Sequence, residues 1–388
     1  MKNKKIALVL SGGGFNGAFQ VGALNYIQEN WNKITGLTSP MKFDLIAGVS
    51  AGALNGALIA MNKLDLLNDL WINKIGKNGV TEIYTSDIID TSSTSSEIKL
   101  KVDLKSISKR LIPEIDLQFG FLKKLGLVFS KKKRKQILDK LLSKVEKGIK
   151  VNYSNLKSVA DNTPLKRKVE KYISQREMKG TKYYCGFVSL DTGKYHSVHS
   201  DSFLTNEDFI NGILASTAIP VVWKPVPKIN FKTPSGIVCS TNNVDGGVRN
   251  VSPLGDIIKL INEEDAEYKI IVINCNSGTV KQEDFGKKSI GAITSRSVYD
   301  IALTEIFNND VNHFMKINEL VKQTKQVYDH VILKNKYAKE LKAFDAVVIN
   351  PHKDIDLGSA LVANEDLISY RILHGRAMAK EAFENYQQ

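Results

Sequence analysis

The chain has 388 residues, of which 43% are hydrophobic and 24% charged, a composition typical of a globular protein with a buried core. Its three cysteines are widely spaced and none stands at metal-ligand spacing with a histidine, which argues against a disulfide framework or a zinc site. The formal net charge is +13, and residues 99–150 alone hold sixteen Lys and Arg against five Asp and Glu, so one segment carries most of the excess.

Neither apolar stretch near the N-terminus fits an export signal or a membrane span. Residues 6–10 are too short for the core of a signal peptide, and glycines rather than a cleavage site follow them. Residues 45–62 approach the length of a membrane helix, but Gly, Ser and Asn interrupt them, which favours a buried strand and a buried helix. We therefore expect a cytoplasmic or peripheral membrane protein, with non-classical export left open.

Apolar strands alternate with helices along the chain, which predicts an α/β sheet covered on both faces. Between residues 76 and 150 the pattern changes to a Thr/Ser run followed by the basic stretch. The predicted strands are 5–10, 42–47, 182–190, 194–198, 269–274 and 347–351, and the predicted helices are 17–29, 53–61, 65–75, 210–218, 253–262, 296–334 and 364–385.

The segment Gly48-Val49-Ser50-Ala51-Gly52 stands between a predicted strand and a predicted helix. Glycines two residues before and after the serine permit the strained turn that exposes its hydroxyl. The amides at the start of the following helix point toward the same place, where they can hold developing negative charge. This context predicts that Ser50 is a nucleophile.

The first predicted strand leads into the glycine-rich loop Gly12–Gly17, which satisfies G-x-G-x-x-G before a helix. A dinucleotide site would also need an acid at the end of the second strand, and the serine motif occupies that end. Asp44 instead stands at the start of that strand. We therefore favour an oxyanion hole facing Ser50, with a plain tight turn as the other alternative.

A serine nucleophile needs a base, and the residues alone leave its identity open. An α/β-hydrolase places a histidine after its acid, and of the histidines in that part of the chain only His352 follows a predicted strand in a short turn. The other candidate is Asp245, which Gly246 and Gly247 follow. Taken by itself, this second pattern favours an ordinary Asp-Gly turn over a catalytic role.

The three motifs together, in this order, resemble the patatin-like phospholipase family. Residues 215–220 (Ala-Ser-Thr-Ala-Ile-Pro), 161–165 and 296–318 are also similar to it, so the resemblance covers 5–75 and about 155–385. It implies a three-layer α/β/α sandwich with a mainly parallel central sheet. It further implies one domain spanning 1–388, with a basic insertion at about 76–155 and a helical region from about 295.

The resemblance also implies the chemistry, a Ser–Asp dyad without histidine, metal or cofactor. Ser50 would attack an acyl carbonyl, and Asp245 would accept the proton and return it to the leaving group. The amides of Gly12, Gly13 and Gly14 would hold the oxyanion, and water would hydrolyse the acyl-enzyme. The expected substrates are phospholipids, lysophospholipids or other acyl esters, as for a phospholipase A or lysophospholipase.

Five further glycines belong to the same motifs, whereas one residue departs from the family pattern. Asn16 stands where the family usually has Arg or Lys, and it can donate hydrogen bonds but supplies no positive charge. The supporting glycines are Gly17, Gly48, Gly52, Gly246 and Gly247.

The basic segment 99–150 combines cations with aromatic residues and leucines, a pattern that suits contact with an anionic membrane. A solvated insertion packed on the core is an equal alternative. Nucleic-acid binding is disfavoured because no recognised motif accompanies the charge. A catalytically weak lipid-binding protein and a histidine-dependent esterase or thioesterase remain the alternative functions, and the oligomeric state is not predicted.

Overall fold

The computed structural model describes most of the chain outside the basic insertion. The described residues are 4–86, 158–178, 180–276, 278–280, 282–286, 293, 296–328, 330–334 and 340–386. The basic segment 99–150 and its expected membrane contact therefore lie outside the described residues, as does the predicted insertion apart from its first residues.

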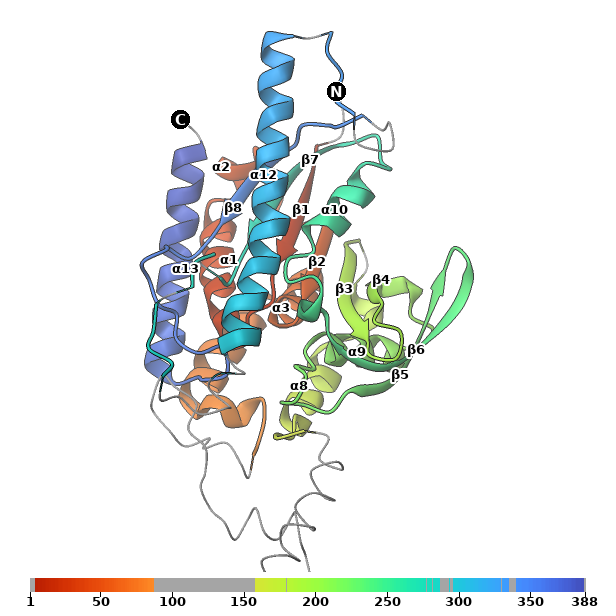
Figure 1. Ribbon diagram of the computed structural model, residues 1–388, viewed down its shortest axis with the longest axis vertical. Coiled ribbons are helices and arrows are strands. Elements are labelled where there is room, and N and C mark those ends of the chain that lie inside the picture. Colours follow the sequence, from red (N-terminus) through yellow and green to blue (C-terminus); the bar gives the residue numbers. More distant parts are fainter. Residues whose placement is uncertain are drawn as a thin grey trace, which may run out of the picture.

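A mixed sheet of eight strands forms the middle layer of the molecule (Figure 1). Its order is β5-β6-β3-β2-β1-β7-β8, with β4 paired to β3 beside this path. The run from β3 to β8 is parallel, and β4, β6 and β5 extend it by antiparallel pairing. The strands are β1 (Lys4–Leu10), β2 (Leu45–Val49), β3 (Lys182–Ser189), β4 (Tyr195–His199), β5 (Val226–Thr233), β6 (Gly236–Asp245), β7 (Glu267–Ile273) and β8 (Asp345–Ile349).

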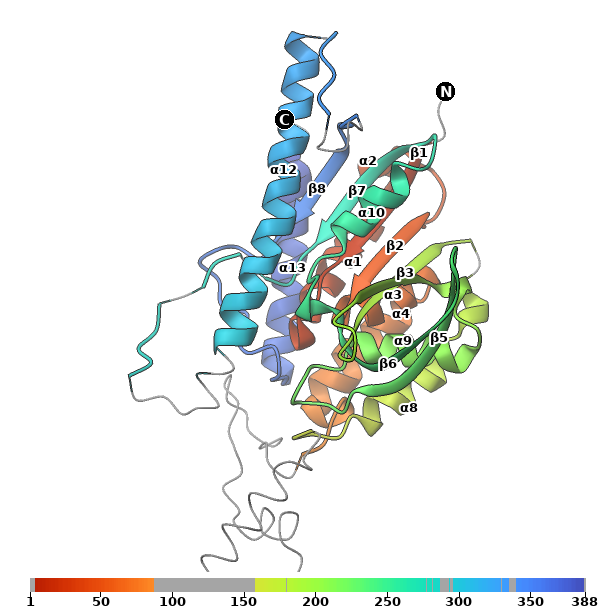
Figure 2. The same cartoon turned by 45° about the vertical axis from the view of Figure 1, so that its right-hand side comes forward.

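Helices cover both faces of this sheet, because alternate side chains of its buried strands point to opposite sides (Figure 2). In β1, Ile6, Leu8 and Leu10 join one apolar cluster, and Ala7 and Val9 join the other. The expected three-layer α/β/α fold with a mainly parallel sheet is confirmed. The first face carries α1 (Ala18–Glu29), α2 (Trp31–Thr35), α3 (Ala51–Ala60), α4 (Leu64–Asp69), α8 (Thr163–Tyr172), α9 (Asn206–Ser216) and α13 (Glu365–Tyr386), and the second carries α10 (Leu254–Ile261) and α12 (Leu303–Val327).

Shorter helical turns connect these elements, and none of the described helices is long and apolar enough to cross a membrane. Two of the turns are π-helical and continue directly into or out of an α-helix. The turns are η1 (Gly14–Gly17), η2 (Leu70–Gly76), η3 (Gly79–Glu82), η4 (Gln175–Glu177), η5 (Ser200–Ser202), η6 (Gly246–Val248) and η7 (Arg296–Ala302).

The structure differs from the sequence-based elements in several places. The helix predicted over 296–334 is the π-helical η7 followed by α12. Helix α12 ends at Val327, and Val321 is its last buried residue. The second strand begins at Leu45 rather than at residue 42, since the Asp44 carboxylate already accepts a hydrogen bond from the Ile6 amide. Helix α8 and the hairpin of β5 and β6 were not predicted.

The C-terminal helix α13 packs backbone to backbone against α1. A β-carbon added at Gly22 of α1 would overlap the carbonyl oxygen of Ile372, and one added at Gly375 of α13 would overlap that of Phe19. The two glycines therefore face each other's helix and allow a contact closer than side chains permit. This crossing anchors the C-terminal part of the chain to the helix that follows the glycine loop.

We expect Gly375→Ala to lower the free energy of unfolding by about 1–3 kcal/mol, because the methyl group forces the two helices apart. Alanine is intrinsically the better helix former by about 1 kcal/mol, so a loss has to come from this packing. Chemical denaturation measures the difference. The matched control is Gly255→Ala in α10, where an added β-carbon meets nothing within 4 Å, and equal effects of the two substitutions would contradict the account.

Candidate active site

Pairing in the sheet brings the three sequence motifs to one edge. Leu10, which precedes the glycine loop, lies opposite Gly48 in the parallel pair of β1 and β2. Val49 lies opposite Gly186 of β3, and the next residue of β3, Phe187, lies opposite Asp245 of β6. The serine and the aspartate are thus placed at the same level by hydrogen-bonded ladders, although almost two hundred residues separate them.

Ser50 occupies a sharp turn between β2 and α3. Its φ of 56° and ψ of −126° lie outside the regions that non-glycine residues usually adopt. The Ser50 amide donates a hydrogen bond to Ser216 Oγ at 2.9 Å, which holds the turn from α9. Gly52 lets the start of α3 lie directly against the carbonyl of Leu10, where any β-carbon would clash. This is the geometry of a nucleophile elbow.

The carboxylate of Asp245 is buried beside Ser50. Its Oδ1 accepts a hydrogen bond from the Gly247 amide at 2.7 Å, and its own amide donates to the Ala218 carbonyl at 3.0 Å. Burial raises the pKa of Asp245 from 3.8 to about 7, although hydrogen bonds from Ser50 and from the Gly247 amide oppose the shift. A carboxyl group with this pKa is a far stronger base than an exposed aspartate.

The glycine loop presents two backbone amides that have no acceptor among the described residues, those of Gly13 and Gly14. The Gly12 amide differs, because it donates to the Val251 carbonyl at 2.9 Å. Asn16 donates its amide to the Gly13 carbonyl at 3.0 Å, and its side-chain Oδ1 is buried without a partner. The loop ends at Gly17, directly before α1.

A further unpaired amide belongs to Ala51, the first residue of α3. Within the described part of the chain it has no acceptor, as expected at the start of a helix. Together with the Gly13 and Gly14 amides it makes three donors around Ser50.

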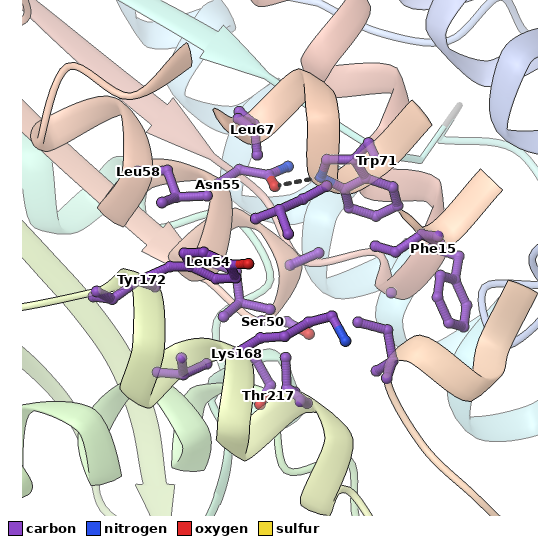
Figure 3. A pocket seen from close by; sticks show the side chains of 18 of the residues that line it. Phe15, Ser50, Leu54, Asn55, Leu58, Leu67, Trp71, Lys168, Tyr172 and Thr217 are labelled. Atoms are coloured by element: carbon purple, nitrogen blue, oxygen red, sulfur yellow. Dashed lines mark hydrogen bonds between the residues drawn. The ribbon is translucent and has the colours of Figure 1, made fainter. Parts of the chain in front are cut away.

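Ser50 lies where two cavities meet. The first contains about 840 Å³ of empty space, including space open to solvent, and is almost entirely apolar (Figure 3). Among the described residues that line it, Lys168 alone is charged, and it forms an ion pair of 2.5 Å with Glu82. The apolar lining comes from η1, α3, α4, η2, α8, the residues directly after η3, α8 and α9, and the loop before α13: Phe15, Leu54, Leu58, Leu67, Leu70, Trp71, Ile75, Ile83, Leu165, Val169, Ile173, Ile219, Trp223 and Leu361.

A chain of buried polar groups ties the wall of this apolar cavity to the glycine loop. Trp71 donates its indole N–H to Asn55 Oδ1 at 2.9 Å (Figure 3). Asn55 in turn donates to Gln20 Oε1 at 2.8 Å, and Gln20 donates to the Ser11 carbonyl at 2.8 Å. Because each of these buried polar groups is hydrogen-bonded, the network stiffens the wall and avoids the free-energy penalty of unpaired buried groups.

The second cavity, of about 1980 Å³, is larger and more polar, and it contains Asp245 and the three loop glycines. Arg296 is the only cation among the described residues that line it, and it lies 3.5 Å from Glu283. Cys275 also lines it, but burial raises the pKa of this thiol to about 12, so it stays protonated near neutral pH.

The loop 357–362, which sequence reasoning missed, walls both cavities. Arg371 of α13 is completely buried and donates to the carbonyls of Leu357 (2.8 Å), Val362 (2.9 Å) and Ser359 (3.1 Å). The loop 357–362 in turn holds the glycine loop in place, because its Ala360 carbonyl accepts a hydrogen bond from the Phe15 amide at 2.8 Å, directly after the triple glycine. The sequence shows an arginine within the predicted helix 364–385, but it does not show that this arginine is buried or which carbonyls accept its hydrogen bonds.

None of the six histidines, all of which are described, lines either cavity. His352 instead donates its amide to His374 Nε2 at 3.0 Å on an exposed part of the surface. The described residues also contain no group of three or more His, Cys, Asp or Glu side chains that could hold a metal ion. Asp44, which a dinucleotide site would have used, lies at the opposite end of β2 from the glycine loop.

Comparison with known proteins identifies the family of the chain. No curated protein sequence matches the chain. Among solved structures, the chain is similar to VipD from Legionella pneumophila, with 12% sequence identity and a TM-score of 0.36, over 99% of this chain and 67% of that one. The family model for patatin-like phospholipase matches residues 8–258, well over half of the chain. The chain therefore belongs to the patatin-like phospholipase family.

Proposed function

We propose that the protein is a serine-dependent lipid acyl hydrolase that works through a Ser50–Asp245 dyad. The observation that carries the proposal is the position of Ser50, which lies beside a buried carboxyl group and at the junction of an apolar and a polar cavity. An acyl ester has the same division, with an apolar chain on one side of its carbonyl and a polar alcohol portion on the other.

In the first half of the reaction, Ser50 Oγ attacks the acyl carbonyl and its proton passes to the Asp245 carboxylate. The amides of Gly13, Gly14 and Ala51 stabilise the oxyanion, because they are fixed in place before the charge develops. The sequence predicts an oxyanion contact for Gly12 as well, but in this proposal its amide is bonded to the Val251 carbonyl and anchors the loop. Asp245 then gives the proton to the departing alcohol oxygen, which leaves an acyl-Ser50 ester.

In the second half, Asp245 takes a proton from the water that attacks the acyl-enzyme carbonyl. It then returns this proton to Ser50 Oγ as the ester bond breaks, which releases the fatty acid and restores the free enzyme. Asn16, Gly17, Gly48, Gly52, Gly246 and Gly247 support this machinery by shaping its turns rather than by reacting. The apolar cavity suits the acyl chain, and the polar cavity with Arg296 and Glu283 suits the glycerol and headgroup of a phospholipid or lysophospholipid.

We expect Ser50→Ala to abolish fatty-acid release and labelling by a fluorophosphonate, with a rate loss of at least about 10³-fold. Asp245→Asn should lose about 10²–10⁴-fold, because it keeps the shape but not the base. Assays on a panel of lipids and soluble esters measure both. The control His352→Ala should stay within about twofold of wild type, and full activity in Asp245→Asn would exclude the dyad.

The raised pKa of Asp245 predicts how activity and stability depend on pH. Only the ionised carboxylate accepts a proton, so kcat/KM should rise about tenfold per pH unit below pH 7 and level off above it. The folded state binds this proton more tightly than the unfolded state, whose carboxyl has a pKa near 3.8. The free energy of unfolding contributed by this group therefore falls as pH rises from about 4 to about 7.

Asp245→Asn removes that titration, so it should gain stability relative to wild type over the same pH interval. Denaturant unfolding at pH 4, 6 and 8 measures the difference between the two proteins. A difference that does not change with pH would contradict the buried, raised-pKa carboxyl.

A further inference from the structure

Val221 has two features that are unusual for a valine, a strained backbone conformation and an exposed position. Its φ is +71°, a region that a β-branched side chain enters only with strain, and its side chain is 69% exposed. The other described non-glycine residues with positive φ are Ser50, in the nucleophile elbow, and two asparagines, which tolerate this region. Core packing therefore does not explain the valine.

The backbone on both sides of Val221 is held firmly, so the strain is imposed rather than accidental. The Val221 carbonyl accepts the Val159 amide at 2.9 Å, and the Val222 carbonyl accepts the Ala160 amide at 2.9 Å. The Trp223 amide donates to the Ile219 carbonyl at 3.0 Å and closes the turn. The bonds fix the turn while the valine side chain stays in solvent.

This turn forms part of the rim of the active site. Ile219 lines both cavities, Pro220 lines the polar one and Trp223 the apolar one. Ala218, just before them, accepts the Asp245 amide at 3.0 Å. Val221 is therefore exposed beside the place where the two cavities meet Ser50.

Two more exposed valines, Val248 and Val280, line the polar cavity itself, and we call them together with Val221 the valine rim. Exposed cations stand beside it in the sequence, Lys224 after the Val221 turn and Arg249 next to Val248. Besides Asp245, two acids line the same cavity, Glu283 and Asp356, and Glu283 faces Arg296 at 3.5 Å. Exposed apolar side chains next to cations suit a surface that is apolar inside and anionic outside.

The described residues on either side of the basic segment are linked by hydrogen bonds to the same turn. Val159, which is bonded to Val221, also accepts a hydrogen bond from Ser86 Oγ at 2.6 Å. The sequence between Ser86 and Ser158 carries most of the excess positive charge of the chain. The described residues that flank this charged stretch are therefore bonded to the turn that carries Val221.

We propose that the valine rim is the surface by which the protein docks on an anionic lipid bilayer, with Val221 entering the boundary of the acyl chains. The inference rests on the proposed function, because an ester can reach Ser50 only after leaving its bilayer at this rim. The strain at Val221 is then retained for membrane contact and not for folding.

The test substitution is Val221→Asn, which removes the apolar contact and suits the positive φ. We expect a higher melting temperature, at least about tenfold weaker binding to anionic vesicles in sedimentation and a matching loss of phospholipid hydrolysis in those vesicles. Hydrolysis of a soluble short-chain ester should not change. The matched control is Val327→Asn at the end of α12, where the valine is 68% exposed and lies outside both cavities.

Unchanged vesicle binding in Val221→Asn would overturn the proposal, and so would a loss of equal size in Val327→Asn. An equal loss on vesicles and on the soluble ester would place the effect in the catalytic site and also overturn it. Loss of preference for anionic over neutral vesicles in Lys224→Gln/Arg249→Gln would support it. If wild type hydrolyses no ester, the proposed function fails, while the sedimentation result still decides the docking surface.

Discussion

The left-handed backbone of Ser50 is the constraint on which the rest of the site depends. A strained residue at the end of a buried strand persists only when its surroundings determine it completely. Here the Ser50 amide is bonded to Ser216 of α9, and Gly52 brings α3 against the carbonyl of Leu10. The same tight turn places the unpaired Ala51 amide and the glycine loop around the hydroxyl group. The sheet, α3 and α9 thus serve as a rigid frame for one side chain.

Two buried ionisable side chains belong to the candidate site, and burial affects their protonation differently. Asp245 has few partners, so burial raises its pKa to about 7, as the proposed role of a base requires. Arg371 is also fully buried, and burial lowers its pKa to about 10, but three carbonyls of the loop 357–362 accept its hydrogen bonds and it stays charged. That loop walls both cavities and bonds to Phe15. The part of the chain beyond the family match at residue 258 therefore completes the candidate site.

Local features of the site could be predicted from sequence, because the need for glycine in a tight turn depends only on neighbouring residues. The elbow around Ser50 and the strand before it were identified correctly in type, as were the glycine loop and the central strands. Strand β6 was missed because two of its buried residues, Ser240 and Asn243, are polar and bond to each other, which hides the apolar alternation. Helix α8 was missed because it buries only Leu165 and Val169 among many charges.

The cavities were beyond sequence reasoning for a different reason. The apolar one has walls from at least four elements that meet only in the folded chain, and the Gly12 amide is bonded to the carbonyl of Val251, which is far from it in the sequence. The spacing of residues in the sequence does not indicate which distant residues will contact or hydrogen-bond each other. The positions of Ser50 and Asp245 relative to the two cavities are therefore a result of tertiary packing.

The most direct test of the central claim is a crystal structure of the protein after reaction with a long-chain alkyl fluorophosphonate. The account predicts a covalent bond to Ser50 Oγ, the phosphonyl oxygen within hydrogen-bond distance of the Gly13 and Gly14 amides, and the alkyl chain in the apolar cavity. An adduct on another residue would contradict it. So would a Ser50 adduct whose chain lies in the polar cavity.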